Sequence, residues 1–188
     1  MAESLDTEID LSQYPHINKG LEGIVAFTTR KSFIDGKEGE LIYAGYDIDT
    51  LAENASFEEV CFLLWNDRLP TQQELDELNT KMQNNRDLPK PVLDYIKGTS
   101  KSAEPMAVLR TAVSMLGDFH EVNADNDKEF HLNKAINITA KFPTIIAAFD
   151  RSRNGKEIVD PLDEKSTAYN FLYMLNGEEP GDQAEKTM

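Results

Sequence analysis

The chain has 188 residues, of which 40% are hydrophobic and 28% are charged, a balance typical of a globular protein. Acidic residues outnumber basic ones by 34 to 19, and the resulting formal charge of -15 argues against a general surface for nucleic acid or for an anionic membrane. The single cysteine, Cys61, excludes an intrachain disulfide, and its place in the apolar run VCFLLW favours a core residue over a reactive thiol.

Residues 1–19 are acidic and lack the apolar segment of a secretory signal. Nor does any apolar stretch approach the ~20 residues needed to span a bilayer. We therefore expect a soluble, cytoplasmic protein. Because no repeat or Gly/Ser-rich linker divides the sequence, we predict an N-terminal arm, residues 1–19, followed by one domain over residues 20–188.

Between Gly20 and Ile48 the sequence is rich in glycine and in loosely alternating β-branched and aromatic residues. Asp35-Gly36, with Gly39 close behind, is a turn signal. The pattern predicts two or three short strands around this turn. Such a hairpin is marginally stable alone, so we expect it to lie against an apolar surface.

After Ile48 the spacing of apolar residues becomes helical. Ser56 and Glu59 have the spacing of a capping box ahead of one amphipathic helix, and Thr71 and Glu74 repeat it ahead of a second. The segment NDRLP joins the two, which predicts a short antiparallel pair of helices.

Two further helices are expected in the middle of the chain. Pro105 suits the first turn of one that ends near Gly117. The longest helical pattern runs from about Lys128 to Arg153, and Pro143 within it removes one backbone donor, so we expect a kink or a break there. Apolar residues cover more than one face of this segment, which predicts a central helix or one at a subunit interface.

The end of the chain carries one more helical pattern and a start signal. Ser166 or Thr167 begins a helix that Asn176-Gly177 ends. Asp182 and Glu185 have capping-box spacing, which predicts the first turn of another helix. In all, about six to eight helices and one small hairpin are expected.

The histidines are the first candidates for acid–base chemistry near neutral pH. His16, His120 and His131 belong to no spacing that binds a metal ion or activates a nucleophile, so we interpret them as structural or solvated. The glycine-rich segment lacks a GxxxxGK[ST] phosphate-binding pattern. The residues alone therefore predict no metal site and no visible active site.

Charged residues near helix ends have a plain interpretation. Arg151 and Arg153 could contact an anion, but they also suit the negative end of a helix dipole, which is the role we favour. The pair Glu58-Glu59 lies beside a helix start, and solvated caps explain it better than paired catalytic carboxylates.

Four stretches carry a resemblance to a known family. They are GLEGIVAFTTRKSFIDGKEGELIYAGYDIDTLAENASFEEVCFLLWNDRLPTQQEL, EPMAVLRTAVSMLG, AKFPTIIAAFDRSRNG and NFLYMLNGEEP. In order and spacing, over about residues 20 to 188, they resemble the N-terminal half of a citrate synthase of the shorter bacterial kind. The resemblance implies an all-α fold, made of helices of that family's large domain with a short N-terminal β-hairpin, incomplete at its C-terminal end.

Two positions depart from the family's pattern. Ala44 stands where the family usually has arginine in YRGY, and Glu104 stands where it usually has histidine before Pro-Met. Neither position matches a catalytic group of the family, but both put local polar contacts in question.

The family's chemistry is an acyl transfer. An aspartate removes a proton from the methyl group of acetyl-CoA, a histidine stabilises the enol, and the enol attacks oxaloacetate; hydrolysis then releases citrate and CoA. The resemblance implies that these groups lie beyond Met188, so we expect no catalytic residue in this chain and no activity from it alone. Acetyl-CoA would be a substrate, and no bound cofactor is implied.

The resemblance also implies a homodimer, because helices of this region pack across a two-fold axis in the family. The candidate interface residues are Met106, Leu109, Val113, Leu116, Ile136, Phe142, Ile145 and Phe149. Two alternatives stay open: a 2-methylcitrate synthase that uses propionyl-CoA, and a non-catalytic helical module that dimerises.

Overall fold

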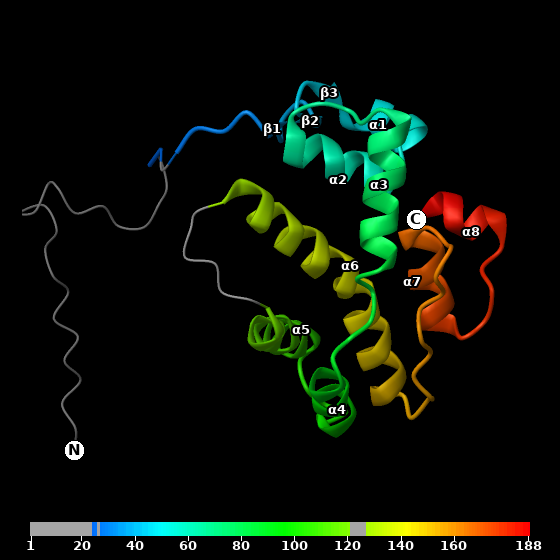
Figure 1. Ribbon diagram of the computed structural model, residues 1–188. Coiled ribbons are helices and arrows are strands. Elements are labelled where there is room, and N and C mark those ends of the chain that lie inside the picture. Colours follow the sequence, from blue (N-terminus) through cyan, green and yellow to red (C-terminus); the bar gives the residue numbers. More distant parts are fainter. Residues whose placement is uncertain (1–23, 26, 121–126) are drawn as a thin grey trace, which may run out of the picture. The chain divides into compact units, whose positions relative to one another are not determined.

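The computed structural model describes residues 24, 25, 27–120 and 127–188, and the chain divides into two compact units, residues 1–30 and 31–188. The second unit holds the described helices and strands (Figure 1). In chain order they are β1 (Ser32–Asp35), β2 (Glu40–Tyr43), β3 (Tyr46–Asp47), α1 (Ile48–Asn54), α2 (Phe57–Asn66), α3 (Gln72–Gln83), α4 (Lys90–Gly98), α5 (Pro105–Met115), the 3-10 helix η2 (Leu116–Phe119), α6 (Lys128–Arg153), α7 (Thr167–Asn176) and α8 (Asp182–Thr187). This is the predicted all-α class with a small hairpin. The predicted domain boundary at residue 20 lies outside the described residues.

The three strands form one antiparallel sheet in the order β1-β2-β3. The side chain of Asp35 explains the first turn, because its Oδ1 accepts hydrogen bonds from the backbone N–H groups of Lys37 and Glu38 at 2.9 and 3.2 Å. Gly39 completes the turn with a φ of 74°. The predicted hairpin around Asp35-Gly36 is therefore confirmed.

The second turn contains the first departure from the family's pattern. Ala44 has a φ of 47°, in the left-handed region, and its N–H donates to the carbonyl of Lys31 at 2.9 Å. A non-glycine residue in this conformation costs roughly 1 kcal/mol. The turn therefore carries a small local strain.

Replacing Ala44 with glycine is expected to raise the free energy of unfolding by up to about 1 kcal/mol, because glycine adopts this conformation without a Cβ clash. Urea unfolding measures the change. Glycine at Ala52, an exposed position inside α1, is the matched control and should lower stability. A loss of stability in both variants would contradict the assignment of strain to Ala44.

Both predicted capping boxes are confirmed at the starts of α2 and α3. Ser56 accepts from the N–H of Glu59, whose carboxylate accepts in return from the N–H of Ser56 at 2.7 Å. Thr71 and Glu74 make the same reciprocal pair. These four residues fix where the helical pair begins, since each box satisfies amide groups that the first turn leaves without a partner.

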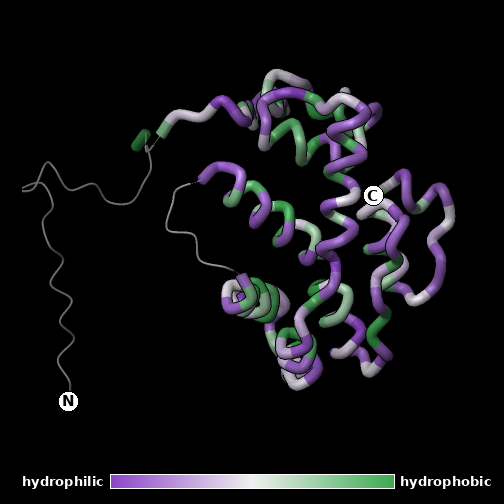
Figure 2. The backbone as a smooth tube through the Cα atoms, viewed as in Figure 1, coloured by the Kyte–Doolittle hydropathy of each residue, from purple (hydrophilic) through white to green (hydrophobic). Residues whose placement is uncertain are grey.

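The central element is α6, which contacts α3, α4, α5 and α7 (Figure 1). Hydrophobic residues recur along it between hydrophilic ones (Figure 2). One core cluster joins it to α4 and α5, and its buried members are Leu88, Val92, Ile96, Val108, Ala112, Leu116, Ile145, Ala148 and Phe149. A smaller cluster joins it to α3 and consists of Leu78, Met82, Ile136 and Ala140, with Phe62, Trp65 and Leu132 packed against it.

The long helix is continuous through Pro143 from Lys128 to Arg153, so of the kink or break predicted there the break does not occur, and the kink stays a prediction. Proline in a helix interior costs about 3 kcal/mol, and helices in proteins owe most of their stability to tertiary packing. The turns on both sides of Pro143 are held in this way, because Ala140, Thr144 and Ile145 are buried. The lost hydrogen bond is that from position 143 to the carbonyl of Thr139.

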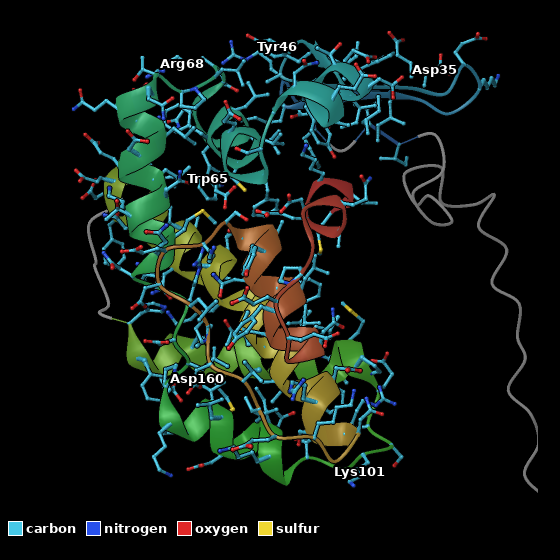
Figure 3. All side chains as sticks on the ribbon, turned by 90° about the vertical axis from the view of Figure 1, so that its right-hand side faces the viewer. Asp35, Tyr46, Trp65, Arg68, Lys101 and Asp160 are labelled. Atoms are coloured by element: carbon cyan, nitrogen blue, oxygen red, sulfur yellow. The ribbon has the colours of Figure 1, made fainter. Side chains whose placement is uncertain are left out.

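The last two helices confirm one predicted start and correct another. Ser166 is the N-cap of α7 and accepts from the N–H of Tyr169 at 3.0 Å, as expected. The capping box predicted at Asp182 and Glu185 is wrong, because Gly181 is the N-cap of α8 and no side chain caps this helix. Glu185 instead accepts from the hydroxyl of Ser166 at 2.5 Å, which ties α8 to the N-terminal end of α7. The ribbons of α7 and α8 lie next to each other in Figure 1 and Figure 3.

Glu104, the second departure, is the N-cap of α5, and its Oε2 accepts from the N–H of Ala107 at 2.8 Å. Replacing it with alanine is expected to cost about 1 kcal/mol, because one amide of the first turn loses its partner. Aspartate at the same position should retain most of the stability. Chemical denaturation compares the three proteins, and equal losses for alanine and aspartate would contradict a capping role.

Candidate functional site

A cluster of basic and amide side chains lies where α6 passes the end of α3 and η2. The Lys141 ammonium is buried and donates to the carbonyl of Asn85 at 2.6 Å. Burial lowers the pKa of Lys141, and nearby Asp87 opposes that effect. Asn137 of α6 donates to the side chain of Asn85, which follows α3, and so adds a second hydrogen bond between these two segments.

His120 completes this cluster. Two cavities of about 280 and 340 Å³ share His120 and Asn137 in their walls. Burial lowers the pKa of His120, and the positive charges of Lys141 and Lys134 lower it further. The lowered pKa favours the neutral form of the imidazole.

The structure places the other histidines apart from this cluster. His131 lies exposed near the start of α6, and His16 lies outside the described residues. Within residues 24, 25, 27–120 and 127–188, no three His, Cys, Asp or Glu side chains are grouped so that they could hold a metal ion. The same part of the chain contains no helix long and apolar enough to cross a membrane.

The thiol of Cys61 lies on α2. Burial raises its pKa to about 12, and Glu58 adds to the effect. The thiolate is the reactive form, so at neutral pH this side chain is an unreactive thiol. Cys61 is only partly buried and belongs to neither core cluster, so the prediction of an unreactive thiol is supported but that of a core residue is not.

A buried polar link joins α2 to α7. Glu58 is buried, and its Oε1 accepts from the N–H of Thr167 at 2.9 Å. This corrects the interpretation of Glu58 as a solvated cap of its own helix: it caps the first turn of α7 instead. The hydroxyl oxygen of Thr167 is buried and makes no hydrogen bond of its own.

The loop before α7 is held by two more buried side chains. Arg86 donates to the carbonyls of Leu162 and Lys165 at 2.9 and 2.6 Å. The amide of Asn170 bonds to both the N–H and the carbonyl of Leu162. Burial lowers the pKa of Arg86, while Glu58 opposes that effect.

Arg151 is buried rather than solvated. Its guanidinium donates to the carbonyl of Glu157 and, at 3.3 Å, to that of Leu175 in the last turn of α7. Arg151 lies in the last turn of α6, as predicted, and its bond to Leu175 places its charge at the C-terminal end of α7 as well.

An apolar groove lies between the middle of α6 and the start of α7. It has a volume of about 450 Å³ and is lined mainly by Phe57, Phe142, Pro143, Ile146, Phe171 and Met188. Phe57 is 49% exposed and Ile146 is 40% exposed, so the groove is open to solvent. Thr139 and Thr167 are the polar residues among those that line it.

The eight candidate interface residues fall into two groups. Leu116, Ile136, Ile145 and Phe149 are at most 6% exposed and pack in the chain's own core, so they have little area left for another chain. Met106 is 65% exposed, and Leu109, Val113 and Phe142 are partly exposed. Dimerisation itself stays a prediction.

Sequence patterns missed the buried charges Glu58, Arg86 and Lys141. The sequence offered one signal of burial, for Glu58 and Lys141 only: each lies in a predicted helix beside apolar residues. Nothing local distinguishes such a residue from one on a solvated face, because the partner lies elsewhere in the sequence.

Comparison with known proteins extends the motif resemblance to the whole described unit. Residues 20–188 match a family model described as "Citrate synthase, C-terminal domain". A citrate synthase from Haloferax volcanii is 46% identical over 176 residues, which are 91% of this chain and 46% of that protein. The 2-methylcitrate synthase 1 of Corynebacterium glutamicum is 36% identical over 89% of this chain and 44% of its own length.

The fold agrees as well. The crystal structure of citrate synthase from Pyrobaculum aerophilum superposes with a TM-score of 0.81 at 34% identity, over 88% of this chain and 44% of that one. The chain thus spans less than half the length of the relatives it matches. Its hairpin, its helices and its motifs all lead to one conclusion: the chain belongs to the citrate synthase family.

Proposed function

We propose that this chain supplies the N-terminal part of an enzyme that condenses acetyl-CoA with oxaloacetate and releases citrate and CoA. The observation that carries the proposal is the 46% identity to a citrate synthase over 91% of the chain. The family's catalytic aspartate and histidine would belong to the part of the relatives that the chain does not span. The reaction is acid–base work that uses no metal ion and no prosthetic group, and we place it in the cytoplasm.

A thiol-release assay with acetyl-CoA and oxaloacetate tests this function. The complete product of the gene should release CoA, whereas the 188-residue chain should not. Turnover by the 188-residue chain would contradict the position assigned to the catalytic groups. A complete product without turnover would contradict the function and favour the non-catalytic module.

Propionyl-CoA is the alternative acyl donor, since the relatives include a 2-methylcitrate synthase at 36% identity. The higher identity to the Haloferax citrate synthase, 46%, favours acetyl-CoA. Comparing kcat/KM for the two acyl-CoA substrates decides between them, and a preference for propionyl-CoA would overturn the first choice.

We further propose that the protein is a homodimer whose contact includes the exposed part of α5. Met106, Leu109 and Val113 lie at helical spacing, and Met106 is 65% exposed. Replacing Met106 with aspartate should shift the sedimenting species from dimer to monomer. A chain that sediments as a monomer without the substitution would refute the proposal.

A further inference from the structure

A pocket rich in basic and amide side chains lies between the end of α3, the residue after η2 and the first half of α6. Its volume is about 280 Å³. Among the described residues no aspartate or glutamate lines it, although acidic residues outnumber basic ones by 34 to 19 in the chain. A positive pocket in so acidic a protein concentrates anions locally. The polar residues that form this basic pocket are Lys81, Asn85, His120, Asn133, Lys134 and Asn137.

The ammonium groups around the basic pocket keep their positive charge without a neighbouring carboxylate. No salt bridge between described residues includes Lys81, Lys134 or Lys141. The ammonium of Lys134 lies over the ring of Phe130, 4.5 Å from its centroid, and that ring lines the same pocket. A cation–π contact of this kind leaves the N–H groups on the other side of the ammonium free to bind an anion.

Lys141 adds its charge from an adjoining cavity of about 340 Å³, which shares His120 and Asn137 with the basic pocket. Lys141 is 7% exposed and donates to the carbonyl of Asn85. An ammonium has three donors, so two of them are left without a partner among the described residues. Asp87 lines this second cavity and opposes the effect of burial on Lys141. The basic pocket contains no such carboxylate and is therefore the better place for an anion.

Two buried polar atoms in the wall that the two cavities share also lack a partner in the described structure. They are Nε2 of His120 and Oδ1 of Asn137. Buried polar groups in native proteins are almost always paired. Burial and the charges of Lys141 and Lys134 lower the pKa of His120, whereas Asn137 opposes that effect. A negative charge beside the lysines would favour a protonated imidazole, which has a donor for the oxygen of Asn137.

From these observations we propose that the basic pocket binds a small anion with a single phosphoryl group. Such a group carries a charge of about -1.5 to -2 at pH 7 and three strong acceptor oxygens. Lys81 and Lys134 would donate to these oxygens, and Asn133 would add its amide. Since Lys81 belongs to α3 and Lys134 to α6, the anion would join two helices that already pack together. The proposal goes beyond the condensation reaction and does not depend on it.

Calorimetric titration of the 188-residue chain with inorganic phosphate at pH 7 tests the site. Potassium chloride keeps the ionic strength constant, so that general screening does not change. Lys134→Met should weaken phosphate binding about tenfold, because a hydrogen bond between charged groups is lost. Lys97→Met is the matched control: Lys97 is an exposed lysine in the last turn of α4, outside the pocket, and its replacement should leave the affinity unchanged.

A second substitution separates a binding role from a structural one. Asn137→Asp places a carboxylate of nearly the same size beside the lysines. Because it supplies the negative charge that the pocket lacks, Tm of the phosphate-free chain should not fall. Phosphate should no longer raise Tm, since the carboxylate repels it. Thermal unfolding with and without phosphate measures both effects. A lower Tm in the absence of phosphate would contradict the excess of positive charge, and a phosphate effect that survives the substitution would contradict the site.

Three further results would overturn the proposal. They are no binding of phosphate by the unaltered chain, equal weakening by Lys134→Met and Lys97→Met, and a rise in Tm with chloride as large as that with phosphate at the same ionic strength. Titration with glycerol 3-phosphate identifies the source of the phosphoryl group. Tighter binding than that of inorganic phosphate would assign the pocket to a phosphate ester, whereas equal or weaker binding would assign it to free phosphate.

Discussion

Replacing Gly177 with alanine is expected to lower the free energy of unfolding by about 3 kcal/mol. Gly177 is the C-cap of α7 with a φ of 82°, a conformation that costs an alanine roughly 1 kcal/mol. A Cβ at this position would also lie 2.7 Å from Nη1 of Arg151. That guanidinium is buried and bound to the carbonyls of Glu157 and Leu175, so it cannot move away without losing those bonds.

Gly155 provides the matched control. It has a φ of 69°, and its Cβ would meet only the Lys101 ammonium at 3.5 Å. Alanine at Gly155 should therefore show the conformational cost alone, about 1 kcal/mol. Urea denaturation measures both variants. Equal losses at the two glycines would show that the close approach of Arg151 contributes nothing.

Replacing Arg86 with methionine is expected to cost about 3 kcal/mol, which corresponds to a fall in Tm of roughly 6–12 °C. The carbonyls of Leu162 and Lys165 would lose their partners, and buried Glu58 would lose a nearby positive charge. Methionine fills most of the same volume, so the loss reports the polar contacts rather than a cavity.

Two further variants sharpen the Arg86 result. Arg68→Met removes an exposed arginine that pairs with Glu74 at 2.5 Å, and surface pairs of this kind contribute little, so Tm should change far less. Glu58→Gln combined with Arg86→Met should cost less than the sum of the single losses, since the uncompensated charge is then gone. Strict additivity would show that Glu58 and Arg86 do not interact.

Local patterns predicted the starts of most helices because a cap is a contact between residues three apart. Ser56, Thr71 and Ser166 each bond within their own first turn, and the sequence spacing contains that information. The same reasoning failed at Asp182, where Gly181 takes the cap position and Glu185 turns to Ser166. A tertiary hydrogen bond outweighed the local one.

The burial of Lys141 and Arg86 could not be predicted from local sequence patterns, because their partners are distant in the sequence. Lys141 bonds to a carbonyl 56 positions away, and Arg86 bonds to one 79 positions away. Of the kink or break expected at Pro143, the break does not occur, because packing on both sides of Pro143 holds the helix together and the sequence shows only the missing donor. The resemblance to the citrate synthase family rests on four stretches in a fixed order and spacing. It predicted the fold, which no single motif could do.

The hydrogen bond from Thr167 to Glu58 also bears on the order in which the chain folds. The two residues are 109 positions apart. At a synthesis rate of 5–20 residues per second, the amide emerges about 5 to 20 s after the carboxylate. During that interval the carboxylate of Glu58 lacks this hydrogen-bond donor, so burying it is less favourable than in the finished fold. The buried position of Glu58 on α2 is therefore fully stabilised only after α7 has been made.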